Sequence, residues 1–178
     1  MNEIKTVVNG NYNEVGDITT LTTTDKTSVV NAINEVNKAS NFIVAGITTD
    51  QTISTLNTAT KLNLNKTIAS NGNLLSLDTT NHVIIVGAGV NYIEISAQYY
   101  IFAFSNNNLR SININKNNTI VSRNLSYIAN NYQTIETSNV AIPVEEGDKI
   151  SLQVVTTGGN ISISHDDNAT RIYVKVID

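Results

Sequence analysis

The feature that most constrains the fold is a strict alternation between apolar and polar side chains in several segments. The longest of these segments, residues 92–102, is apolar at every second position: Ile93, Ile95, Ala97, Tyr99 and Ile101. Neighbouring side chains of a β-strand point to opposite faces, so this pattern predicts a long strand that buries one face. The same alternation recurs in shorter segments, residues 112–115, 150–154, 161–164 and 172–176. A period of two does not suit a helix, so the chain is predicted to be mainly β.

Further strand candidates lie between clusters of turn residues. They are residues 51–56, 60–65, 74–77, 82–86, 119–127 and 133–142. With the alternating segments they bring the total to about ten short strands, a number typical of an antiparallel sandwich or barrel. A jelly roll accommodates this count and protects its edges by pairing two sheets. We therefore predict an antiparallel jelly-roll sandwich that forms a head domain over residues 46–178.

The composition agrees with a β domain and excludes several classes of function. Only 15% of residues are charged and 40% are hydrophobic, with Thr, Ile and Val suited to strands and Asn to turns. The net charge of −4 argues against nucleic-acid binding, and the absence of cysteine excludes disulfides. Residues 1–5 lack the start of a signal peptide, and the longest apolar run, residues 83–90, is too short to span a bilayer. We expect a protein made without export, with no membrane insertion and no cofactor.

One helix is predicted, near the N-terminus. It begins after Thr24-Asp25, either of which can cap it, and Val29, Ile33 and Val36 follow the 4-3 spacing of a coiled-coil seam. A helix this short is marginal in water alone, so its apolar stripe must pack on something. It can lie on the sandwich, or three copies can pack around a common axis as a stalk. Residues 1–20 are predicted to be an extended segment that needs a partner surface to become ordered.

Large aromatic side chains occupy the predicted outer face of the strands. Tyr92, Tyr100, Phe102 and Tyr173 have the opposite parity to the aliphatic core positions. A monomeric sandwich usually fills its outer face with polar groups, so aromatic residues there indicate a second buried surface such as a subunit interface. The alternative is that they are isolated surface side chains. We predict that these aromatic residues form an interface in an oligomer.

Residues 15–36 resemble a segment that recurs in bacteriophage fibre proteins. The matching residues read Val-Gly-Asp-Ile-Thr-Thr-Leu-Thr-Thr-Thr-Asp-Lys-Thr-Ser-Val-Val-Asn-Ala-Ile-Asn-Glu-Val. In such proteins this segment precedes or joins a trimeric shaft, which favours the coiled-coil interpretation of the helix. The resemblance implies that residues 1–20 anchor the chain to a capsid or tail protein and that residues 21–45 form a short trimerising stalk. It also implies a location on the virion, after assembly in the host cytoplasm.

The head resembles the jelly-roll heads of the tumour-necrosis-factor and complement type. The residues that carry this resemblance are 89–96, 144–152 and the closing segment 171–176. Within the second of these, Gly147 allows a tight turn before a strand, and Asp148 can bond the local backbone. That family is trimeric, so the resemblance implies a homotrimer and agrees with the aromatic face. The chain departs from the family in being rich in Asn, so loop contents and ligand sites are not carried over.

The function favoured by these features is that of a structural virion protein, a trimeric head fibre or capsid decoration whose head projects outward. The alternatives are a tail or baseplate fibre that binds a receptor, and a non-viral, lectin-like trimer. Amides and aromatic rings in loops suit the hydroxyl groups of host-surface carbohydrate, and weak sites gain avidity in a trimer. The candidate glycan contacts are Asn106, Asn107, Asn108, Asn131, Tyr132, His165 and Asp166.

The sequence carries no pattern typical of a catalytic site. The chain has two histidines and no nucleophile-elbow motif, so a hydrolase is not expected. The densest polar cluster, His165-Asp166-Asp167-Asn168, is interpreted as a solvated turn, with calcium binding as the alternative. A glycan depolymerase would need a carboxylate pair on a concave surface. We expect a protein that is not an enzyme.

Overall fold

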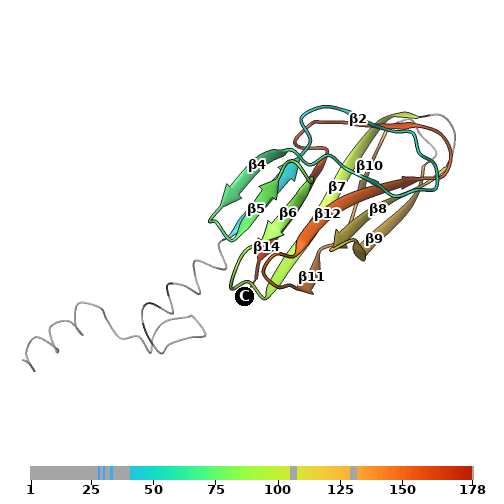
Figure 1. The fold of residues 1–178 in the computed structure, drawn as a ribbon. Coiled ribbons are helices and arrows are strands. Elements are labelled where there is room, and N and C mark those ends of the chain that lie inside the picture. Colours follow the sequence, from blue (N-terminus) through green and yellow to red (C-terminus); the bar gives the residue numbers. More distant parts are fainter. Residues whose placement is uncertain are drawn as a thin grey trace, which may run out of the picture.

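The computed structural model describes Ser28, Val30, Ile33 and residues 41–104, 108–128 and 132–177. The continuous stretches form two antiparallel sheets that pack face to face (Figure 1). Each sheet contributes alternate side chains to one shared core, as the alternation predicts. The prediction of a mainly β, antiparallel sandwich is therefore confirmed.

The first sheet, here sheet A, follows the strand order β2-β13-β7-β14-β1-β4, and β10 and β11 also pair with β7. Its strands are β1 (Phe42–Gly46), β2 (Gln51–Ile53), β4 (Lys66–Asn71), β7 (Tyr92–Phe104), β10 (Gln133–Glu136), β11 (Val140–Pro143), β13 (Ile161–Ile163) and β14 (Arg171–Val176). The long strand β7 pairs with β10, β11, β13 and β14. It is therefore the organising strand of this sheet.

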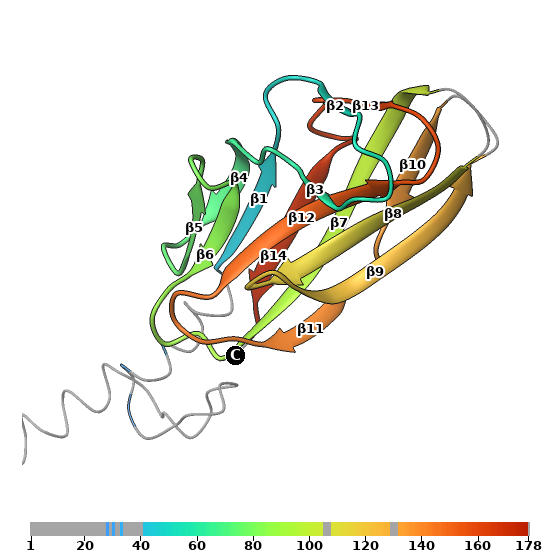
Figure 2. The same ribbon diagram turned by 45° about the vertical axis from the view of Figure 1, so that its right-hand side comes forward.

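The second sheet, here sheet B, follows the order β5-β6-β12-β8-β9, and β3 also pairs with β12. Its strands are β3 (Thr60–Lys61), β5 (Leu75–Asp78), β6 (Val83–Val86), β8 (Asn108–Lys116), β9 (Thr119–Ile128) and β12 (Lys149–Thr156). Figure 2 shows β12, β8 and β9 side by side on the face of the sandwich opposite to sheet A. Strand β9 lies at the end of this strand order.

The core lies between the two sheets and is almost entirely aliphatic. Ile93, Ile95 and Ile101 of β7 are completely buried, as are Ile112 and Ile114 of β8. Each buried aliphatic side chain of this size stabilises the fold by about 1.5–3 kcal/mol through removal of apolar surface from water. The alternating positions that the sequence assigns to the interior are therefore confirmed as core positions.

Two large polar side chains share this interior. Tyr99 of β7 is completely buried, and its hydroxyl donates a hydrogen bond to the Ser111 carbonyl of β8 (3.4 Å), which links the two sheets. Burial raises the pKa of the Tyr99 hydroxyl well above its usual range. Arg110 has the same parity as Ile112 and is also completely buried, with Nη1 donating to the Leu109 carbonyl.

Turn chemistry fixes where the strands reverse. Asn117 and Asn118 are the two residues between β8 and β9, and both have positive φ angles of 49° and 68°. A two-residue hairpin loop of this kind matches the right-handed twist of its strands, and Asn tolerates the conformation. Gly147 has a φ of +85° in the turn before β12, as predicted for a tight glycine turn.

The boundary predicted at residue 46 is wrong by a few residues. Strand β1 begins at Phe42, pairs with β14 and β4, and contributes Ile43 and Ala45 to the core. Residues 42–45 therefore belong to the sandwich and not to a stalk. Their alternation is too short to be recognised beside the predicted helix.

Two further strand predictions need correction. Strand β4 (66–71) was not predicted, because only the adjacent residues Ile68 and Ala69 interrupt its polar side chains, and they do not alternate with polar ones. The segment 133–142 is not one strand but two, β10 and β11, which pair with successive parts of β7. Polar residues separate them, and these residues are part of the site described below.

The predicted N-terminal elements fall mostly outside the described residues. Ile33 has helical backbone conformation and an exposed side chain, whereas Val29 and Val36 lie outside the described residues, as does the segment 1–20. The coiled-coil helix, the stalk interface and the anchor therefore stay predictions. Within the part of the chain that the structure describes, no helix is long and apolar enough to cross a membrane.

Candidate functional site

The predicted interface residues lie on the outer face of sheet A, which points away from the core. Tyr92, Tyr100 and Phe102 are on β7, and Tyr173 is on β14. Tyr92 is 50% exposed and the other three are partly exposed. Their parity is as predicted, whereas their role in an interface stays a prediction.

Two of these aromatic side chains pack against further aromatic rings on the same chain. Tyr173 contacts Phe42 of β1, with ring centroids 6.0 Å apart and planes tilted by 33°. Tyr100 stacks on Tyr132, with centroids 6.5 Å apart. The sequence analysis missed Phe42, although this residue directly precedes the buried Ile43. It assigned Tyr132 to a loop that contacts glycans. The outer face of sheet A thus carries two pairs of packed aromatic rings, here called the aromatic clusters.

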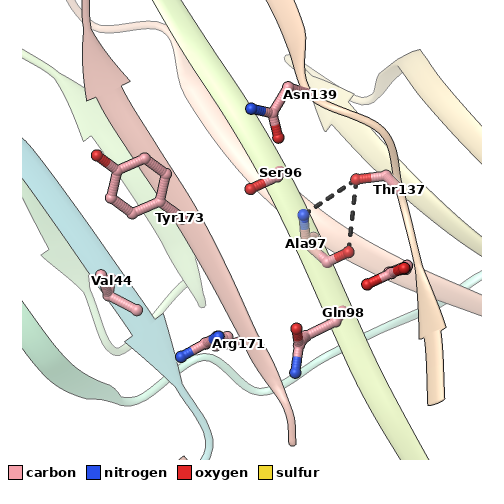
Figure 3. Close-up of a pocket in the computed structure, with 9 residues that line it drawn as sticks. Val44, Ser96, Ala97, Gln98, Thr137, Asn139, Arg171 and Tyr173 are labelled. Atoms are coloured by element: carbon pink, nitrogen blue, oxygen red, sulfur yellow. Dashed lines mark hydrogen bonds between the residues drawn. The ribbon is translucent and has the colours of Figure 1, made fainter. Parts of the chain in front are cut away.

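A groove of about 370 Å³ opens on this face between the aromatic clusters (Figure 3). In Figure 3, Ser96 and Gln98 stand on β7 in the middle of the view, with Tyr173 on one side and Asn139 on the other. The residues that line this groove are Val44, Ser96, Ala97, Gln98, Glu136, Thr137, Asn139, Arg171 and Tyr173. Strand registers explain the arrangement, because Tyr173 pairs with both Val44 and Ser96.

Opposite charges lie in the same groove. Arg171 of β14 pairs in register with Gln98 of β7, and Gln98 pairs with Glu136 of β10, so the three residues form a row across three strands. Within residues 41–104, 108–128 and 132–177, neither Arg171 nor Glu136 forms an ion pair. Charges of both signs are therefore available on this face to a partner surface.

Thr137 closes the far side of the groove, where β10 ends and β11 has not begun. Its hydroxyl accepts a hydrogen bond from the Ala97 N–H (3.0 Å) and donates to the Ala97 carbonyl, and its own N–H also donates to that carbonyl (Figure 3). Thr137 is buried. A side chain thus replaces the missing ladder bonds of the sheet at this point. Sequence reasoning missed this role because it read 133–142 as one strand.

The candidate glycan loops are only partly described. Asn106, Asn107 and Asn131 lie outside the described residues, and Asn108 is the first residue of β8. Tyr132 is 65% exposed. These residues keep their predicted role as candidates. Of them, Tyr132 stacks on Tyr100, whose carbonyl accepts a hydrogen bond from the N–H of Ser164, next to His165.

The cluster around His165 is held together by hydrogen bonds of a turn. The N–H and Nδ1 of His165 both contact Oδ1 of Asp50, at 2.9 and 2.7 Å, and these bonds lower the pKa of the Asp50 carboxyl. Asp166 accepts a hydrogen bond from the Asn168 N–H, and Asp167 forms an ion pair with Lys66. Among the described residues, no group of His, Asp or Glu side chains could hold a metal ion. The hydrogen bonds are those of a turn.

Comparison with known proteins supports the fold. No family model matches the chain, and no curated protein matches it. Among solved structures, it is similar to murine APRIL, with a TM-score of 0.57 and 11% identity over 76% of this chain and 98% of the other. It is also similar to Eiger TNF from S. frugiperda, with a TM-score of 0.55 and 17% identity over 78% of this chain and 94% of the other. The head therefore has the jelly-roll fold of these tumour-necrosis-factor-type domains.

Proposed function

We propose that this protein is a homotrimeric structural protein of a bacteriophage particle, a head fibre or capsid decoration whose jelly-roll head projects outward for attachment to the host. The outer face of sheet A is the subunit interface of the head in this proposal. The observation that carries it is the combination of aromatic clusters and a groove with both charge signs on that one face.

The physical argument concerns what a water-exposed sheet face ordinarily carries. Aromatic rings that face solvent leave apolar surface exposed, and burial against a second copy removes it from water at about 25 cal/mol per Å². Aromatic residues and arginine are enriched at the centres of protein interfaces. Tyr92, Tyr173 and Arg171 lie on adjacent strands of this face, so they can act together in one contact. The structural similarity to APRIL and Eiger TNF is in keeping with this proposal.

The assignment to a phage particle is supported by the resemblance of residues 15–36 to phage fibre segments. Under this proposal, residues 1–20 dock to the capsid and the predicted N-terminal helix contributes a short stalk. The jelly-roll head provides a compact, outward-facing domain of the kind that such a fibre needs.

Light scattering on the full chain tests the trimer. We expect a mass three times the 19.3 kDa of one chain. A Tyr92→Glu variant places a charge on the outer face of sheet A and is expected to shift the protein towards monomer. Tyr127→Glu is the matched control, because Tyr127 is 66% exposed on sheet B. A monomeric wild type, or equal masses for both variants, would contradict the interface.

Electron microscopy of particles labelled with antibody against this chain tests the location. We expect label distributed over the capsid. Label confined to the tail would overturn the head-fibre assignment and favour the receptor-binding fibre. Absence of label from purified particles would contradict the virion assignment altogether.

A further inference from the structure

A second groove lies on the outer face of sheet B, on the opposite side of the sandwich from the proposed subunit interface. It has a volume of about 260 Å³ and lies over β8, β9 and β12, which Figure 2 shows side by side. Its lining residues are Leu109, Arg110, Ser111, Arg123, Leu125, Val155 and Thr157. None of the residues considered so far for interface or glycan contact belongs to it.

Part of the groove wall is apolar and is formed by Leu109, Leu125 and Val155. Leu109 is 38% exposed and Leu125 is 54% exposed, and Leu109 pairs in register with Tyr127, which is 66% exposed. Leu125 pairs with Ser111, so these side chains lie on one continuous stretch of the β8–β9 ladder. Large apolar side chains gathered on one exposed surface are typical of a binding site.

Arg123 lines this groove and is oriented by a hydrogen bond. Nε of Arg123 donates a hydrogen bond to Oδ1 of Asn113 (3.0 Å), and Asn113 is completely buried on the outer side of β8. This bond leaves the terminal amino groups of the Arg123 guanidinium as donors for a ligand, and Arg123 is exposed. No acidic side chain lines the groove within residues 41–104, 108–128 and 132–177. The site therefore offers a positive charge beside an apolar wall.

Unsatisfied amides lie directly under the same face. Nδ2 of Asn113 and both polar side-chain atoms of Asn115 are buried without a hydrogen-bond partner among the described residues. Most buried polar atoms in folded proteins do have a partner, and an orphaned group calls for an explanation such as a bound ligand or a bridging water. The parity of β8 places these amides on the side of the sheet that carries the groove, since Ile112 and Ile114 fill the core.

We propose that this groove binds an anionic sugar unit of a host-surface polysaccharide. A planar guanidinium binds a carboxylate or a sulfate in a fork of two hydrogen bonds. The C–H face of a sugar ring packs on the leucine side chains of the groove, and its hydroxyl groups bond to the polar lining residues Ser111 and Thr157. The volume lies just below the 300–1,000 Å³ typical of larger ligands, which suits a single sugar unit.

The inference rests on the proposed function, because attachment through weak sugar sites gains from three copies in one trimer. It differs from the loop-based prediction, because the contacts come from strand residues held by the sheet and not from the loops around Tyr132 and His165. A site on strands is held in place by the sheet more firmly than a site on loops.

Titration of the full chain, followed by NMR, tests the inference with three probes: methyl β-glucuronide, glucose 6-sulfate and methyl β-glucoside. We expect saturable shifts at β8 and β9 with at least one of the two anionic sugars, and binding of the neutral sugar at least tenfold weaker. Arg123→Gln should lower the affinity for the anionic sugar about tenfold, which corresponds to about 1.4 kcal/mol. Leu125→Asn should weaken binding through the apolar wall, with thermal unfolding as the check that both variants fold.

Lys149→Gln is the matched control, since it removes one exposed positive charge from the same sheet outside the groove. Equal binding of neutral and anionic sugars, no shifts at β8 and β9, or wild-type affinity in Arg123→Gln would overturn the inference. Light scattering on the same samples separates the two proposals. A trimer without sugar binding at this groove contradicts only the inference, whereas a monomer contradicts the trimeric fibre itself.

Discussion

Asp148 joins two turns of the sandwich, and its replacement by Asn is predicted to destabilise the fold by about 2 kcal/mol. Its carboxylate accepts hydrogen bonds from the Glu145 N–H (2.9 Å) and from the Asn117 amide, and it forms an ion pair with Lys116 at 3.1 Å. Asn117 in turn accepts a bond from the Lys149 N–H. The β8–β9 hairpin is thereby fastened to the turn that precedes β12.

The magnitude follows from these contacts. A hydrogen bond to a charged group contributes about 1.5–3 kcal/mol and a neutral one about 0.5–1.5 kcal/mol, so loss of the charge weakens the Glu145 bond by about 1 kcal/mol. The ion pair to the partly exposed Lys116 adds at most about 1 kcal/mol after solvent screening. A total near 2 kcal/mol lowers the melting temperature of a domain of this size by about 4–8 °C.

The pH dependence provides an independent check. Burial acts to raise the pKa of the Asp148 carboxyl, but the hydrogen bonds from Glu145 and Asn117 and the Lys116 charge outweigh it and hold the pKa below its ordinary 3.8. A group with a lowered folded pKa contributes stability that is fully present above its unfolded pKa and is lost as the pH falls through its folded pKa. The difference between wild type and Asp148→Asn should therefore be constant from pH 7 to about pH 5 and shrink below about pH 4.

Chemical denaturation at pH 7 and at pH 3 measures the loss in free energy of unfolding caused by Asp148→Asn and its decrease at low pH. Asp78→Asn is the control, because hydrogen bonds from Asn81 and Thr80 also lower the pKa of the Asp78 carboxyl, but Asp78 is only half-buried whereas Asp148 is buried. We expect a clearly smaller effect there. A free energy of unfolding for Asp148→Asn within about 0.5 kcal/mol of wild type at pH 7 would refute the reasoning, since that is the range of ordinary surface substitutions.

Three substitutions test other parts of the fold by thermal unfolding. Gly87→Ala should lower the free energy of unfolding by about 3 kcal/mol. The added Cβ would lie 2.9 Å from the Leu74 carbonyl oxygen and disturb the 2.7 Å hydrogen bond that the Gly87 N–H donates to it. Gly147→Ala should cost only about 1 kcal/mol, from its positive φ, because nothing lies within 4 Å of the added atom; equal losses at the two glycines would contradict this distinction. Thr137→Val keeps the shape but leaves the Ala97 N–H without its acceptor, so we expect a loss of about 2 kcal/mol, and an unchanged melting temperature would show that the bridge is not needed.

Much of the sandwich could be predicted because its pattern is local. Alternation in residues 92–102 and 172–176 identifies which side chains are buried, since the period of a strand is two whatever its partners are. The same rule places Tyr92 and Tyr173 on the outer face. Strand β4 escaped prediction because an edge strand with polar side chains has no such pattern.

The candidate sites could be predicted only in part. The aromatic residues of sheet A stand out by parity, but Arg171 and Glu136 come together through the registers of β14, β7 and β10. Arg123 and Leu125 on sheet B could not be recognised as site residues from the sequence. Their place in the groove depends on the pairing of β9 with β8, which brings Arg123 to Asn113.

The sequence by itself determined the fold class, the inward and outward faces of the long strands, and the Asn and Gly turns, because each of these depends on residues close together in the chain. Only the tertiary structure decided which strands are neighbours, since pairing joins residues far apart in sequence. It therefore decided that Thr137 completes the hydrogen bonds of Ala97, that Arg110 is buried, and that each sheet carries a groove on its outer face.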